Sequence, residues 1–299
     1  MPFVKRATDR TGLAIILSLV ALALFDGMGL IIKLLSADYT AAELSAWRNI
    51  FGLIPALIAL STSRKWRETG RRFKIRQWKL ALSRGAIVTF AQLFFYLSLG
   101  RMEFATASTI TYANALFMTA LAVPLLGEVV GWVRWGAVMV GFAGVVLVMQ
   151  PGSDTFSTDA LYPLGAAFMY ALVAVTARMF DEDVPSPLVS FYSNSAAMVG
   201  SVILALALGG FSPVAMADIP WLMAMGAFGG TAVLIIVVSQ RMTEQANLAP
   251  FSYFGIPFAF LLGWLFFGET PWDALFPGAI LIAAGGLLIV WRERRKEVA

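Results

Sequence analysis

Long apolar runs, separated by short polar breaks, recur along the whole chain of 299 residues. A helix needs about twenty apolar residues to cross the hydrocarbon core of a bilayer. Backbone groups in lipid must bond to one another within the segment, so we expect helices and not strands. The pattern predicts an all-α integral membrane protein with ten spans, at residues 12–35, 42–61, 78–99, 104–126, 131–149, 160–179, 188–209, 219–240, 247–267 and 273–291.

Basic residues gather at three places along this pattern: the N-terminus, the loop after the second span and the C-terminus. That loop reads TSRKWRETGRRFKIRQWK, whereas the loops QPGSDTFSTDA and GGFSPVAMADIP contain no Lys or Arg. Positive loops stay in the cytoplasm, so both termini should lie on the cytoplasmic side of a bacterial-type inner membrane. Because the basic loop joins two spans, we interpret it as lying on anionic headgroups and expect no nucleic-acid partner.

Composition narrows the function classes. Hydrophobic residues make up 59% of the chain and charged residues only 13%, about half the charged share of soluble domains. The chain has no Cys and no His, which removes zinc sites, thiol nucleophiles and imidazole bases. No Lys follows a Gly, so the phosphate-binding loop of ATPases is missing. We therefore expect a protein that binds no metal or cofactor, is not an enzyme, and draws its energy from gradients or from a partner.

The two halves of the chain repeat each other. GAVMVGFAGVVLV at 136–148 matches GAILIAAGGLLIV at 278–290, and a Gly-Glu pair precedes each segment. This predicts two five-helix domains, 1–150 and 151–299, and the odd number of spans turns the second one upside down. Inverted repeats build transporters that bind substrate near the midplane between the halves. Since one chain carries both halves, we expect a functional monomer.

In these features the chain resembles the drug/metabolite transporter superfamily, in its ten-helix EamA-type branch. The resemblance covers nearly the whole chain and is carried by Lys33, Trp47-Arg48, the Gly-Glu turns at 127–128 and 268–269, Pro257 and the Gly-rich fifth and tenth spans. It implies that spans 1–4 and 6–9 surround a central cavity, that spans 5 and 10 are peripheral, and that the protein exports metabolites, often amino acids. The family usually has Trp-Gly where this chain has Phe25-Asp26, so substrate identity does not carry over.

Asp26 and Arg48 are the charges that lie deep in predicted spans. Counted from the same membrane face at 1.5 Å per residue, they lie about 14 Å and about 9 Å deep. Charges within a bilayer are costly and are usually paired or functional. One hypothesis is an Asp26–Arg48 pair lining the cavity, with Asp26 binding a proton or a substrate ammonium and Arg48 a substrate carboxylate. The alternatives are a purely structural ion pair and a protonated, neutral Asp26.

Further polar and aromatic residues fall on helix faces that would suit a cavity wall. Arg84, Gln92 and Tyr96 share one face of the third span. Lys33, by contrast, is expected to reach water at the outer boundary. The complete set of candidate substrate-binding residues is Asp26, Trp47, Arg48, Arg84, Gln92, Tyr96, Tyr112, Tyr170, Asn194 and Tyr253.

Together these patterns predict a secondary transporter of small organic metabolites that works by alternating access. Amino acids are the favoured substrate, because a zwitterion needs both charges, and protons are a possible coupling ion. The alternative is a carrier of a larger metabolite such as riboflavin, a nucleoside derivative or S-adenosylmethionine. An intramembrane aspartyl protease would need a second deep aspartate. A simple pore would need a ring of polar residues, and the chain has none.

Overall fold

The computed structural model describes most of the chain. The described residues are 11–68, 70, 73, 76–127, 130–149, 157–180, 184–242, 251, 253–270, 272, 276–285, 287 and 288. Its regular elements there are helical, as predicted. The helices are α1 (Thr11–Leu35), α2 (Ala41–Thr62), α3 (Arg64–Glu68), α4 (Trp78–Leu99), α5 (Phe104–Thr111), α6 (Asn114–Leu126), α7 (Trp132–Met149), α8 (Leu161–Thr176), α9 (Ser186–Ala207), α10 (Ile219–Met242) and α12 (Gly255–Phe267), with 3₁₀ turns at Thr158–Ala160 and Ala177–Met179 and a further helical stretch at 278–285.

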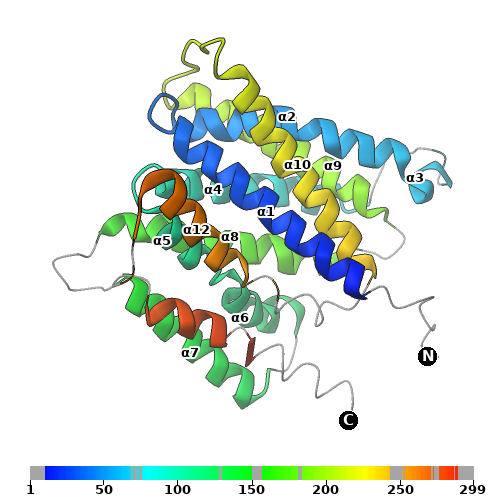
Figure 1. The fold of residues 1–299 in the computed structure, drawn as a ribbon. Helices are drawn as coiled ribbons and strands as arrows, with labels where there is room; N and C mark the ends of the chain where they lie inside the picture. The colour runs from blue at the N-terminus through cyan, green and yellow to red at the C-terminus, as the bar shows by residue number, and fades with distance from the viewer. Residues whose placement is uncertain are drawn as a thin grey trace, which may run out of the picture.

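Helices from the two halves of the chain interleave in the bundle (Figure 1). Helix α10 packs against α1 and α2, and α9 packs against α2 and α4. Helix α8 lies against α4 and α6, and α12 lies against α5 and α1. Helix α7 and the helical stretch 278–285 lie together at one edge of the bundle, which fits the scaffold role predicted for the fifth and tenth spans.

The lengths of the helices confirm only part of the predicted span pattern. Within the described residues, seven helical segments are long and apolar enough to cross a membrane, and two more, Trp135–Met149 and Gly255–Phe267, are apolar but shorter. Of the expected ninth span, 247–267, the described residues are 251 and 253–267, and α12 covers Gly255–Phe267. Large apolar side chains such as Ile16, Ile203 and Leu206 are about 60% exposed, as expected on a surface that faces lipid.

One expected span, 104–126, is present but is divided by a short turn. The run 104–126 forms two helices, α5 and α6, that meet at Tyr112 and Ala113. Helix α12 likewise begins after a turn at 253–254. Helices α6 and α12 have 13 residues each, and both end in a left-handed glycine, Gly127 and Gly268. Glycine adopts this conformation without steric cost and ends a helix there.

Proline does not interrupt α12. Pro257 is the third residue of α12. The first four backbone N–H groups of a helix have no partner within it, so a proline there loses nothing. Pro250, the other proline of the expected ninth span, lies outside the described residues.

Glycines set how closely the peripheral helices approach. A Cβ at Gly144 of α7 would lie 2.6 Å from the Gly278 carbonyl oxygen and 2.8 Å from the Ile282 nitrogen, whereas a Cβ at Gly136 would meet no described atom within 4 Å. Small residues at such crossings let backbones pack directly against each other. The contact between α7 and 278–285 therefore depends on Gly144 and not on Gly136.

These two glycines give a matched test of the scaffold. We expect Gly144→Ala to lower the melting temperature of the detergent-purified protein, because overpacking costs about 1–3 kcal/mol. Gly136→Ala should leave the melting temperature unchanged or raise it, since alanine is the better helix former. Equal melting temperatures for the two variants would contradict the close contact.

Candidate functional site

A network of buried polar side chains joins α2, α4 and α9 in the middle of the bundle. Asn49 Nδ2 donates to Gln92 Oε1 at 2.7 Å and to Ser201 Oγ at 3.1 Å, and Gln92 Nε2 donates back to Asn49 Oδ1 at 3.2 Å. Ser45 Oγ, one turn before Asn49 on α2, donates to Gln92 Oε1 at 3.1 Å. All four residues are buried. In a low-dielectric interior, a satisfied network of this kind fixes its members in place.

Arg48 is attached to this network at one end only. Its Nη1 donates to Asn49 Oδ1 at 3.0 Å, but its buried Nε has no partner in the described part of the chain. The guanidinium lies against α10 at Gly229, where a Cβ would lie 2.8 Å from Arg48 Nε. Tyr96 of α4 and Tyr170 of α8 lie within electrostatic range of Arg48. Arg48 is therefore a buried cation with an unused donor, within electrostatic range of two tyrosines.

Asp26 of α1 is buried, and its Oδ2 has no hydrogen-bond partner among the residues that the structure describes. The expected Asp26–Arg48 ion pair is not formed: the ion pairs among the described residues are Lys33–Glu269, Arg64–Glu68 and Arg101–Asp159. The rise per residue gives the depth of each charge, but it does not give the direction in which either side chain points. Asp26 and Arg48 are therefore two buried ionisable groups, and neither has a charged partner among the described residues.

Tyr112 connects Asp26 to the breaks in the helices. It lies within electrostatic range of Asp26 and sits at the junction of α5 and α6. Its phenol lies directly on the backbone of Gly255 at the start of α12, where a side chain would collide with it. The turn between α5 and α6 therefore meets the start of α12, within electrostatic range of the unpaired carboxyl group.

The other predicted residues lie apart from Arg48 and Asp26. Trp47 stacks on Phe51 with ring centroids 6.0 Å apart, and its buried Nε1 finds no partner within the described ranges. Arg84 Nη1 donates to Thr176 Oγ1 at 3.5 Å, where α4 meets α8, so it does not join Gln92 and Tyr96. Asn194 of α9 is partly buried.

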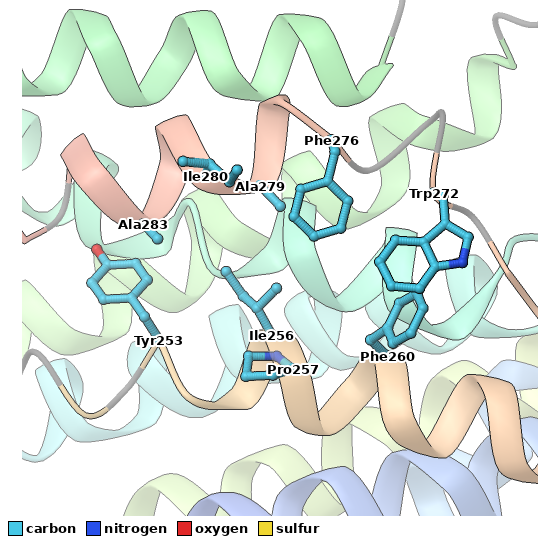
Figure 2. Close-up of a pocket in the computed structure, with 9 residues that line it drawn as sticks. All are labelled: Tyr253, Ile256, Pro257, Phe260, Trp272, Phe276, Ala279, Ile280 and Ala283. Atoms are coloured by element: carbon cyan, nitrogen blue, oxygen red, sulfur yellow. The ribbon is translucent and has the colours of Figure 1, made fainter.

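Tyr253 lies in an apolar cavity of about 330 Å³ between α12 and the stretch 276–283 (Figure 2). Figure 2 shows its ring on one side of Ile256 and the rings of Phe260 and Trp272 on the other. The Tyr253 hydroxyl is buried and has no hydrogen-bond partner among the described side chains and backbone groups.

Lys33 does not reach water as expected. Its ammonium forms an ion pair with Glu269, donates to the Met102 carbonyl oxygen at 2.7 Å and leaves only 13% of the side chain exposed. The sequence signals also missed the roles of Ser45 and Asn49. Ser45 and Asn49 are four residues apart, so they lie on one face of α2. This spacing is the sequence pattern from which the network could have been predicted.

Comparison with known proteins decides the family. A sequence model of the EamA-like transporter family matches residues 12–150 and 158–291. The chain belongs to the EamA-like transporter family. It is therefore a multi-pass protein of the inner membrane that transports a small metabolite.

Several relatives and a solved structure extend the comparison. The chain is 24% identical to an S-adenosylmethionine uptake transporter of Rickettsia bellii, over 94% of this chain and 93% of that one. It is 30% identical to a riboflavin transporter of Vibrio cholerae over 62% of this chain and 61% of that one. It is 26% identical to human solute carrier family 35 member G1 over 99% of this chain and 84% of that one. A solved crystal structure matches 96% of this chain and 99% of its own, with a TM-score of 0.65 and 18% identity, which supports the fold.

The buried network makes a prediction about stability. Asn49→Ala should leave Gln92 Nε2 and the Arg48 guanidinium without the acceptor Asn49 Oδ1, at a cost of about 1–3 kcal/mol for each unsatisfied group. We expect a lower melting temperature in detergent. Ser61→Ala is the matched control on α2, because Ser61 is exposed and donates within its own helix, to the Ile58 carbonyl oxygen. If both variants melt at the wild-type temperature, the network does not hold the helices together.

Proposed function

We propose that this family member carries a nucleoside-bearing zwitterion of the S-adenosylmethionine type. The observation that carries the proposal is that Arg48 and Asp26 are both buried while neither has a charged partner within the described residues. Ionisable groups inside a membrane protein generally face a cavity and serve function. A ligand with a carboxylate and a cationic centre would supply the missing partner to each.

The neighbours of Arg48 fit the rest of such a ligand. Its guanidinium has free donors for a carboxylate, and charge-assisted bonds of this kind are among the strongest in proteins. Tyr170, which is partly buried and lies within electrostatic range of Arg48, would offer its ring to a purine. Asp26, on helix α1, would face the sulfonium or ammonium group. The proposed substrate is still a zwitterion, as the sequence predicts, but it is larger than an amino acid.

The relatives also favour a larger metabolite over an amino acid. The S-adenosylmethionine uptake transporter aligns over 94% of this chain, and the riboflavin transporter of Vibrio cholerae aligns over 62% at higher identity. Riboflavin is the second candidate because of that identity. It carries no net charge, however, and would leave Arg48 and Asp26 unpaired in the bound state.

The mechanism proposed is alternating access between two inverted five-helix repeats, 1–150 and 151–299, that make ten spans with both termini in the cytoplasm. The two separate family matches and the matching lengths and glycine ends of α6 and α12 support this organisation. Such a carrier moves its substrate in the direction set by the gradients, as a monomer. Asp26 is the group that would take up a proton if transport is coupled to one.

Counterflow in proteoliposomes tests the substrate. Vesicles containing the purified protein and loaded with unlabelled S-adenosylmethionine should accumulate external labelled S-adenosylmethionine by exchange. Excess S-adenosylhomocysteine, which lacks the sulfonium charge, should compete less well. Counterflow of riboflavin or of amino acids, with none of S-adenosylmethionine, would overturn the proposed substrate and leave the family assignment intact.

The two buried charges make a second prediction. Arg48→Gln and Asp26→Asn should each raise the half-saturation concentration for S-adenosylmethionine about tenfold or more, because a hydrogen bond to a charged group contributes about 1.5–3 kcal/mol. Arg101→Gln is the control, since Arg101 is half exposed and pairs with Asp159. Wild-type half-saturation in both site variants would show that these charges are scaffolding.

A further inference from the structure

Three chain segments are joined by one ion pair at the end of the bundle opposite α3 (Figure 1). Lys33, in the last turn of α1, pairs with Glu269 and donates to the Met102 carbonyl oxygen at 2.7 Å. The other carboxylate oxygen of Glu269 accepts from the Phe104 backbone nitrogen at 2.7 Å, at the start of α5. The Lys33 ammonium also lies 4.8 Å from the centre of the Phe267 ring. The two charges are 13% and 12% exposed. We call this arrangement the Lys33–Glu269 latch.

The latch joins α1 to two helices that pack against each other. Helix α5 is separated from α6 by the break at Tyr112, and α12 begins only after the turn at 253–254. Both therefore lack helical continuity at their far ends from the latch, and they pack against each other. The latch lies at their other ends. Glu269 follows Gly268 at the end of α12, and its carboxylate accepts from the Phe104 backbone nitrogen at the start of α5. Tilting of this pair about its breaks would require the latch to open.

A buried apolar layer lies at the same end of the bundle. It is built from both halves of the chain, so it fills the space where the two halves meet. Its fully buried members near the latch include Ile32, Leu99, Ala107 and Ala259. Water entering from this face would have to part this layer, and the latch holds its walls together.

We propose that the Lys33–Glu269 latch is the gate that closes the face opposite the basic loop, and that this face opens when α5 and α12 swing away from α1. A nearly buried pair is stable while the layer is closed, and once the layer parts, water hydrates both charges. The Lys33–Glu269 latch therefore has two favourable arrangements, paired and hydrated, as a gate requires. The inference depends on the chain being a transporter but not on which metabolite it carries.

Thiol labelling can test the gate directly, because the chain contains no cysteine. Ala107→Cys places one thiol in the apolar layer behind the latch, and a membrane-impermeant maleimide is added to the face opposite the basic loop. The thiol should react slowly in the otherwise wild-type chain. Adding Glu269→Gln or Lys33→Met should raise the labelling rate about tenfold, the ratio that corresponds to about 1.4 kcal/mol. Asp159→Asn is the matched control, since it breaks the more exposed Arg101–Asp159 pair and should leave the rate unchanged.

A second variant tests the gate without relying on a broken ion pair. The double variant Lys33→Cys, Glu269→Cys should stop counterflow when a short thiol cross-linker joins the two positions, and a reducing agent should restore it when the linker contains a disulfide. A labelling rate of the Ala107→Cys thiol that does not change in either latch variant would overturn the proposal, as would full counterflow in the cross-linked protein. Both results test the gate and not the substrate. The proposed substrate is tested separately, by S-adenosylmethionine counterflow in the unmodified chain.

Discussion

A charged side chain within the bilayer is costly unless it pairs with another group of the protein or with a substrate. This constraint governs how the charged residues of the bundle are arranged. Lys33 and Glu269 meet it by pairing with each other and with two backbone groups. Arg48 meets it in part, through one bond to Asn49. Asp26 does not meet it within the described residues. The latch is thus complete as it stands, whereas Arg48 and Asp26 are the groups with capacity left for a substrate.

Close helix packing holds these charges in their places. The polar network of Ser45, Asn49, Gln92 and Ser201 ties α2 to α4 and α9, and the absence of a side chain at Gly229 lets the Arg48 guanidinium lie against α10. The same helices that bury Arg48 therefore also fix its orientation. A fixed guanidinium loses less entropy when it binds a carboxylate than a mobile one does.

Hydropathy predicted the helices well where a span is continuous. The runs 42–61 and 78–99 differ by one residue or less at each end from α2 (Ala41–Thr62) and α4 (Trp78–Leu99). The break between α5 and α6 was missed because Thr111-Tyr112-Ala113-Asn114 contains neither glycine nor proline, so no local signal marks it. The pairing of Lys33 with Glu269 was missed because the two residues are 236 positions apart. The depth of Asp26 and Arg48 could be counted from the sequence, but their directions depend on how α1, α2 and α10 pack.

The structure of the protein bound to S-adenosylmethionine would test the central claim most directly. The account predicts that the ligand carboxylate lies within hydrogen-bond distance of the Arg48 guanidinium, and that a cationic group of the ligand faces the Asp26 carboxyl group. A ligand bound away from both residues, or a bound state in which Arg48 and Asp26 pair with each other, would contradict it.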